Sequence, residues 1–238
     1  MSKERLDKIL ASQNIGSRKE VGKIIKSGRV IINSDVIKLQ DYKVDPKVDE
    51  IFIDNKKIEF KRHIYIMMNK PKGIISASND KSQKTVIDLL PDKLKRRGLF
   101  PAGRLDKDTT GLLIITDDGD FAHRMLSPKK RIYKIYEAKL SSKIGSREIN
   151  LFKSGVRLDD ETVCLPADLK ILTHCDEPIV EVKICEGKFH QIKRMFKSVG
   201  TNVISLKRKQ IGSLVLDKAL EEGCSRELSE NEIKNIFK

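Results

Sequence analysis

Apolar residues recur at the spacing of one helix face over residues 3–11, which predicts a short amphipathic helix at the start of the chain. Ser17, followed three residues later by Glu20, is typical of a helix N-terminus, and it precedes a second apolar stripe that ends at Gly28. The segment VIIN then predicts a strand that runs into a turn. Residues 1–60 are therefore expected to form a small helix–helix–sheet module.

Short apolar strands and turns dominate the rest of the chain after a charged connection, EFKRH. The run IYIMMNK predicts a buried strand that ends at the turn signal PKG, and GLLIIT predicts another. One helix is expected over residues 85–90, and another where Ile192 and Phe196 recur at helical spacing. The pattern over residues 61–238 predicts an α+β domain with a mainly antiparallel mixed sheet.

The charge balance narrows the range of partners. The chain carries 48 Lys and Arg residues against 34 Asp and Glu, a formal charge of +14. A surface this basic attracts nucleic acid or an anionic membrane. The run GLLIIT is far shorter than the ~20 apolar residues that span a bilayer, so nucleic acid is favoured and no membrane association is expected.

The cysteines and the N-terminus indicate a reducing compartment. The chain contains four cysteines, with neither a CxxC pair nor a histidine at metal-ligand spacing: Cys164, Cys175, Cys185 and Cys224. The N-terminal segment MSKERLDKIL lacks the apolar core of a signal peptide. We therefore expect a cytoplasmic protein without a structural metal.

Basic side chains gather on one face of the second predicted helix. Arg18, Lys19 and Lys23 lie opposite its apolar stripe, and Arg29 follows its end. Such a face is either an RNA-binding surface or an ordinary solvated one, and the charge pattern alone leaves both readings open.

The segment PAGRLDKDTTGLLIITDDGD concentrates acid in this basic chain. Its spacing from Asp106 onward imitates a calcium-binding loop, but the apolar run LLIIT is typical of a strand, and the last ligand would be Asp in place of Glu. Asp117, Asp118 and Asp120 are expected to begin and cap a helix over FAHRML. Asp106 and Asp108 need another explanation.

The sequence around Asp106 and Asp108 resembles that of a known family. GRLDKDTTGLLIITDDGDFAHRMLSP resembles the signature of the RNA pseudouridine synthases, in particular the RsuA-type branch that modifies small-subunit ribosomal RNA. The blocks MMNKPKG, KIYEAKL and EGKFHQIKRMFKSVG occur in the family's order, and residues 5–33 resemble the alpha-L RNA-binding motif, a motif of ribosomal-protein type. Together these blocks cover nearly the whole chain.

The resemblance assigns three catalytic residues. Asp106, in GRLD, would be the carboxylate that acts at the uridine sugar, either by attacking C1′ or by removing a sugar proton. Lys193, in HQIKR, would be its basic partner, since a cation within ~4–6 Å favours the charged form of a carboxylate. Tyr136, in KIYEA, would contact the displaced uracil, although an isolated tyrosine in a strand is more often a packing residue. The isomerisation needs no cofactor.

Further basic residues are expected to bind the RNA backbone around this site. Arg104 would hold a phosphate or fill the space that the flipped uridine leaves. Lys70, His190 and Arg194 complete the predicted RNA-binding set. The expected partner is ribosomal RNA of the small subunit, bound by a monomer; the alternatives are a synthase for large-subunit (23S) ribosomal RNA and a noncatalytic RNA-binding or ribosome-assembly factor.

Overall fold

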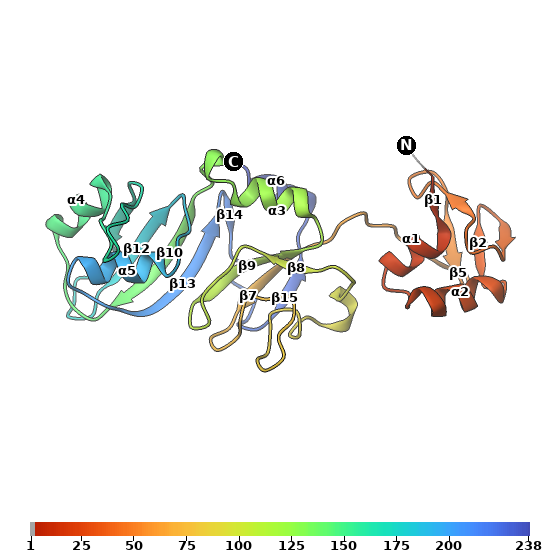
Figure 1. Cartoon of the computed structure of the whole chain (residues 1–238), viewed down its shortest axis with the longest axis horizontal. Helices are drawn as coiled ribbons and strands as arrows, with labels where there is room; N and C mark the ends of the chain where they lie inside the picture. Colours follow the sequence, from red (N-terminus) through yellow and green to blue (C-terminus); the bar gives the residue numbers. More distant parts are fainter. Residues whose placement is uncertain (1–2) are drawn as a thin grey trace. The chain divides into compact units, whose positions relative to one another are not determined.

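The computed structural model describes residues 3–238, which divide into two compact units (Figure 1). The first unit runs through Ile64 and includes Lys95–Gly98, and the remaining residues form the second unit. The short segment joins the first unit because the Arg96 guanidinium donates hydrogen bonds to the carbonyl oxygens of Lys61 and Arg62. Among the described residues, no helix has both the length and the apolar character that a bilayer span requires.

The first unit contains two helices and two small sheets. Strands β3, β2, β5 and β6 form an antiparallel sheet in that order, while β1 pairs with β4. The elements are β1 (Glu4–Arg5), α1 (Leu6–Ser12), α2 (Arg18–Lys26), β2 (Val30–Ile32), β3 (Asp35–Ile37), β4 (Lys43–Val44), β5 (Ile51–Ile53) and β6 (Lys56–Lys57). The predicted helix–helix–sheet order is confirmed.

Helix α2 begins where the sequence indicated. The Ser17 hydroxyl accepts a hydrogen bond from the Glu20 amide at 3.3 Å, and the Glu20 carboxylate accepts one from the Ser17 amide at 2.7 Å. These two bonds satisfy amides that have no partner within the helix. Val21 and Ile25 then face a core shared with α1 and the sheet, which leaves the basic side of α2 in solvent.

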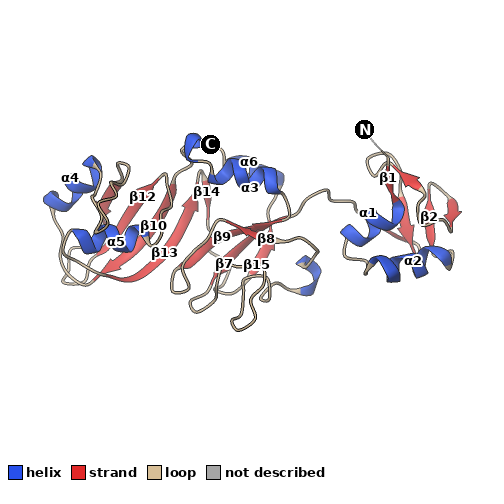
Figure 2. Cartoon of the chain, in the orientation of Figure 1, coloured by secondary structure: helices blue, strands red, loops and turns tan. Residues whose placement is uncertain are grey.

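The second unit is built on one nine-stranded sheet flanked by helices (Figure 2). Its main strand order is β11-β12-β10-β13-β9-β7-β15, with β14 beside β13 and β8 beside β9. The strands are β7 (Tyr65–Lys70), β8 (Phe100–Ala102), β9 (Thr110–Thr116), β10 (Lys134–Leu140), β11 (Asp168–Ile171), β12 (Ile179–Ile184), β13 (Val203–Ile211), β14 (Leu214–Val215) and β15 (Ser225–Glu227). The helices are α3 (Gly119–Leu126), α4 (Ser146–Ser154), α5 (Gln191–Ser198) and α6 (Glu230–Asn235), with short 3₁₀ turns at Asp92–Leu94 and Pro128–Lys130.

The two halves of this sheet meet at the β9–β13 junction. Every other strand pair in the sheet is antiparallel, but β9 and β13 run parallel, with Thr110 opposite Lys207 and Gly111 opposite Arg208. Gly111 has a φ of +99°, and a Cβ there would lie 2.3 Å from the Arg208 carbonyl oxygen. Only glycine permits both this backbone conformation and this close approach.

The expected helix over residues 85–90 does not form. Thr85 pairs with Ile75 in an isolated parallel bridge, and the next four residues make only a turn. The Asp88 carboxylate accepts hydrogen bonds from the Thr85 amide and hydroxyl, at 2.8 and 2.9 Å. These bonds resemble a helix N-cap, but Pro91 disfavours helical backbone at the residue before it, so the turn is not extended.

Candidate active site

An open pocket lies where the loop before β9 meets β10, β13 and the N-terminal end of α5. Its cavity volume is about 80 Å³, and it opens to solvent, so it is a small and accessible pocket. Its lining comprises Arg104, Leu105, Asp106, Thr109, Tyr136, Ile184, Gly187, Lys188, His190, Gln191, Ile192, Lys193 and Leu206. Segments from both sides of the β9–β13 junction therefore contribute to one pocket.

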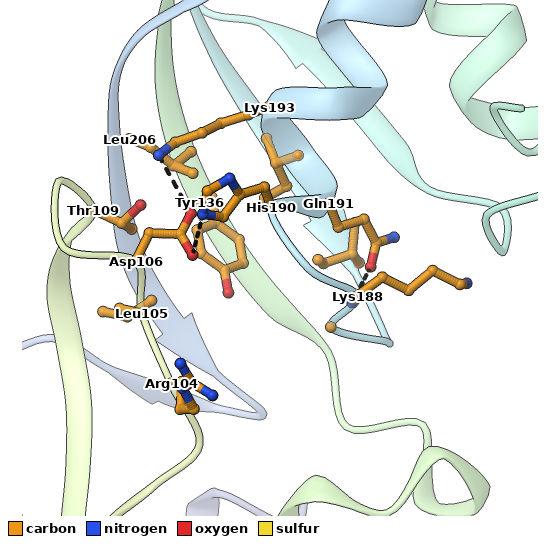
Figure 3. A pocket seen from close by; sticks show the side chains of 13 residues that line it. Arg104, Leu105, Asp106, Thr109, Tyr136, Lys188, His190, Gln191, Lys193 and Leu206 are labelled. Atoms are coloured by element: carbon orange, nitrogen blue, oxygen red, sulfur yellow. Dashed lines mark hydrogen bonds and ion pairs between the residues drawn. The ribbon is translucent and has the colours of Figure 1, made fainter. Parts of the chain in front are cut away.

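Asp106 is held between two basic side chains from the α5 segment (Figure 3). Lys193 Nζ lies 3.3 Å from Asp106 Oδ2, and His190 Nε2 lies 3.5 Å from Asp106 Oδ1. The carboxylate remains 27% exposed, so it faces the pocket and is accessible from solvent. The structure thus brings Asp106, Lys193 and His190 together, as the sequence predicted for the first two.

Asp108 shares the Lys193 ammonium. Its Oδ1 lies 2.5 Å from Lys193 Nζ, and this hydrogen bond lowers the pKa of the Asp108 carboxyl below its ordinary value. Lys193 therefore lies between two carboxylates and keeps a cation against the pocket wall. Asp108 therefore helps to place that cation.

Backbone contacts fix the loop that carries Asp106. The Ser76 hydroxyl donates to the Leu105 carbonyl at 2.9 Å and accepts from the Leu105 amide at 3.1 Å. The Gly73 amide donates to the Lys107 carbonyl at 2.8 Å, and the Thr109 amide donates to the Asp106 carbonyl at 3.1 Å. These bonds restrain the backbone on both sides of Asp106, so its carboxylate keeps one orientation.

Lys70 supports the same loop from inside and is not available to RNA. Its side chain is 0% exposed, and Nζ donates to the carbonyl oxygens of Pro71, Thr109 and Lys107 at 3.1, 3.0 and 3.3 Å. Burial lowers the pKa of Lys70 to about 8, and the nearby carboxylates of Asp108 and Asp106 oppose this shift. The prediction that Lys70 binds RNA is wrong, because no part of the side chain reaches the surface.

Tyr136 forms another wall of the pocket. It lies on β10 opposite Arg208 of β13, and the buried Arg208 guanidinium donates a 3.4 Å hydrogen bond to its hydroxyl. Arg208 itself is anchored by a 2.7 Å bond from Nε to the Leu112 carbonyl. The neighbouring Lys134 is also buried, and burial, followed by the Arg208 charge, lowers the pKa of its ammonium. Tyr136 is thus oriented by a cation and faces the pocket that contains Asp106.

Four of the predicted RNA-binding residues lie in solvent, and two others are already paired. Arg104 lines the pocket and is exposed, while Arg18, Lys19 and Lys23 are exposed on α2. By contrast, Arg194 Nη2 contacts Asp159 at 2.6 Å and Asp160 at 2.7 Å, and Arg29 binds the carboxylate of Asp54. The predicted RNA contacts of Arg194 and Arg29 are therefore not favoured, because each guanidinium already has a carboxylate partner.

Several pocket residues were not predicted individually from the sequence. Thr109 is buried at the base of the Asp106 loop, Leu206 reaches the pocket from β13, Gln191 begins α5, and Lys188 precedes it. Thr109, Gln191 and Lys188 stand inside the motif blocks, so their position in those blocks was the available signal. Leu206 has no such signal, because only the pairing of β13 with β9 and β10 brings it to the site.

The calcium-loop alternative is incompatible with the backbone. Such a loop must curl around the ion over twelve residues, whereas residues 110–116 form the extended strand β9. Within residues 3–238, no group of three or more His, Cys, Asp or Glu side chains is placed to bind a metal ion. Asp118 instead accepts a 3.0 Å hydrogen bond from the Phe121 amide, which confirms the predicted cap of α3.

Replacing Lys193 with glutamine should reduce turnover by about 10–100-fold, because the ammonium that contacts the Asp106 carboxylate at 3.3 Å would be lost. Replacement with arginine should recover most of the rate, since arginine retains the charge. The measurement is single-turnover kinetics on a purified RNA substrate. Equal rates for the glutamine variant and the wild type would show that the Lys193 charge is not needed.

Two families match separate parts of the chain. Residues 64–198 match the RNA pseudouridylate synthase family, and residues 4–49 match the S4 domain. The first match includes Asp106, Tyr136 and Lys193, and the second covers α1, α2 and the strands that follow them. This agrees with the expected order of an RNA-binding motif before a synthase domain.

Relatives cover nearly the full length of the chain. An uncharacterized RNA pseudouridine synthase of Bacillus subtilis (strain 168) is 44% identical over 96% of each chain. Ribosomal small subunit pseudouridine synthase A of Vibrio vulnificus is 40% identical over 98% of this chain and 100% of its own. A crystal structure of a pseudouridylate synthase, 35% identical, aligns with a TM-score of 0.68 over 98% of this chain and 99% of the other.

Proposed function

Because the chain belongs to the RNA pseudouridylate synthase family, we propose that it converts one uridine of small-subunit (16S) ribosomal RNA to pseudouridine, with Asp106 as the catalytic carboxylate. The observation that carries this assignment is the pocket in which Asp106 lies 3.3 Å from Lys193 and shares a wall with Tyr136. A decayed, noncatalytic RNA-binding protein would have no reason to keep this arrangement.

The reaction breaks the N1–C1′ bond of uridine and forms a C5–C1′ bond, so C5 loses a proton and N1 gains one. Asp106 acts on the sugar, either by attacking C1′ or by removing a sugar proton. Lys193 and His190 contact its carboxylate in the pocket. No electron or phosphate is transferred, and no released glycosyl product requires the second carboxylic acid of a glycosidase.

Tyr136 acts on the detached base. Its ring forms a wall against which uracil can turn, and its hydroxyl assists the loss of the C5 proton. The hydrogen bond from Arg208 supports this role because it fixes the position of the phenol oxygen. Arg208 therefore orients Tyr136 without reaching the pocket itself.

Two surfaces place the RNA. Residues 1–60 form an RNA-binding module that uses Arg18, Lys19 and Lys23 on α2, and residues 61–238 form the catalytic domain. Arg104, exposed at the pocket, holds a phosphate beside the flipped uridine. The protein acts as a monomer in the cytoplasm, where ribosomal subunits are assembled.

The choice of the small subunit rests on relatives. Proteins named ribosomal small subunit pseudouridine synthase A, from Vibrio vulnificus and from Escherichia coli (strain K12), are 40% and 36% identical to this chain over 98% of its length. The alternatives are a large-subunit synthase and a noncatalytic assembly factor. The former would leave small-subunit RNA unchanged, and the latter would leave every uridine unchanged.

Mapping pseudouridine in ribosomal RNA from a strain that lacks this protein tests the proposal. We expect one small-subunit site to be lost and to return when the wild-type gene is restored. Loss of a large-subunit site would favour the first alternative, and an unchanged map would contradict synthase activity on ribosomal RNA. Conversion of the same site in a purified transcript would show that the protein acts directly.

A further inference from the structure

Phe189 is an unusual surface residue in this chain. Among residues 3–238 it is the most exposed aromatic side chain, at 76%, compared with 42% for Tyr133 and 40% for Tyr42. Single exposed apolar side chains are common on proteins and need no explanation by themselves. The surroundings of Phe189, however, set it apart.

The Phe189 ring lies directly on the imidazole of His190. The ring centroids are 3.9 Å apart and the planes differ by 15°, which is a stacked arrangement. The same imidazole contacts Asp106, with Nε2 3.5 Å from Oδ1. Only the His190 imidazole therefore separates the exposed Phe189 ring from the Asp106 carboxylate.

The loop that carries Phe189 is braced from within. Gln191 Nε2 donates to Glu186 Oε1 at 2.8 Å, and Gln191 Oε1 accepts from the Lys188 amide at 2.9 Å. The Glu186 carboxylate also accepts from the Leu165 amide at 2.9 Å. These bonds restrain both ends of the loop, so its backbone is already ordered before a ligand binds.

His190 has a left-handed backbone conformation, with a φ of 47° and a ψ of 33°. This conformation is uncommon for residues other than glycine and is unfavourable in free energy. It allows the loop to turn sharply into α5 while the Phe189 and His190 rings remain parallel. The stacked pair is thus a fixed feature at the rim of the pocket.

We propose that the Phe189 ring, supported by His190, is a stacking site for an unpaired RNA base next to the target uridine. This inference rests on the proposed function and specifies how the substrate is held. Nucleobases stack on aromatic rings whatever their identity, and RNA is recognised mainly where bases are unpaired. Phe189 has no hydrogen-bonding group, so the site selects an open RNA segment and does not read one particular base.

The placement of the site favours RNA over a protein partner. An RNA strand whose uridine reaches Asp106 must pass the rim of the same pocket, where the Arg104 side chain is exposed. Stacking the neighbouring base on Phe189 would offset part of the cost of unstacking the target. The result is a substrate held on both sides of the flipped nucleotide, by the pocket and by the ring.

The first test compares Phe189 variants on the transcript that the wild-type enzyme modifies. Phe189→Ala should raise KM by about 5–150-fold, the range given by the loss of one base–aromatic stack, with a much smaller effect on kcat. Phe189→Trp should retain wild-type KM, whereas Phe189→Leu, which is apolar but not planar, should behave like alanine. Tyr133→Ala, which removes an exposed ring from a different hollow, is the matched control and should leave KM unchanged.

The second test identifies the stacked base. Transcripts with a single abasic nucleotide near the target should bind the wild type less tightly when the gap falls at one position, and Phe189→Ala should show no further loss there. Wild-type KM in Phe189→Ala, or an additive loss at every abasic position, would overturn the inference. Failure of the proposed function is distinguishable, since the wild-type enzyme would then modify none of the transcripts. Thermal unfolding of each variant checks that the loop remains folded.

Discussion

Asparagine at position 106 is expected to lower the rate of pseudouridine formation by at least about 10³-fold, the upper part of the range for loss of a catalytic acid or base. Asparagine has almost the same shape as aspartate, but it cannot ionise. The loop remains fixed by Ser76 and Gly73, so stability and RNA affinity should be nearly unchanged. The measurement is single-turnover conversion of a purified transcript, together with RNA binding and thermal unfolding.

Asp108→Asn is the matched control for this result. Asp108 lies in the same loop and contacts the same lysine, but it lies outside the lining of the pocket. Because the Asp108 side chain is 57% exposed, loss of this ion pair should cost no more than about tenfold in rate. Pseudouridine formation by Asp106→Asn that is free of host enzyme would remove Asp106 from its proposed role, and equal losses in the two variants would indicate a general effect of loop charge.

Lys70→Met should be the most destabilising of the substitutions considered. The change removes a buried ammonium that donates to three backbone carbonyls, and those carbonyls would lose their partner. We expect the free energy of unfolding to fall by about 2–3 kcal/mol, because relief of a buried charge offsets part of the loss. Turnover should fall as well, since two of the carbonyls belong to the loop that carries Asp106. Chemical denaturation and single-turnover kinetics measure the two effects.

Lys72→Met is the control, because Lys72 is exposed two residues further along the chain and should change stability by less than about 0.5 kcal/mol. The pH dependence gives a second check. The pKa of Lys70 falls from 10.5 to about 8 on folding, so between these values the unfolded chain binds more protons than the folded one. The Lys70 contribution to stability must therefore rise with pH across this window. The stability difference between wild type and Lys70→Met should widen from pH 8 to 10.5, and a constant difference would contradict the assignment.

Local signals in the sequence were sufficient for much of the fold. The Ser17–Glu20 pair predicted the start of α2, and Asp118 predicted the start of α3, because both act on amides within one helical turn. The buried strands β7 and β9 were visible as continuous apolar runs. Where a structural cause lies within a few residues of its effect, the sequence predicted most outcomes. The exception is residues 85–90, where Pro91 stops the helix that was expected.

Predictions failed where a distant partner decides the role of a residue. Lys70 and Lys72 stand in the same motif block and look alike, yet one is buried beneath the Asp106 loop and the other is exposed. Arg194 was predicted to bind RNA, but in the folded chain it forms ion pairs with Asp159 and Asp160. The resemblance placed Asp106 and Lys193 in one site, but the sharing of Lys193 with Asp108 required three-dimensional geometry.

The parallel β9–β13 junction affects the order in which the nascent chain becomes able to bind RNA and to modify it. Asp106 and Tyr136 leave the ribosome well before residues 203–211, and only these later residues pair both with β9, which follows the Asp106 loop, and with β10, which carries Tyr136. The N-terminal unit, by contrast, has all its strands before residue 65. A partly synthesised chain is therefore expected to bind RNA before it can modify RNA. Catalytic activity is acquired late in translation, when β13 pairs with both β9 and β10.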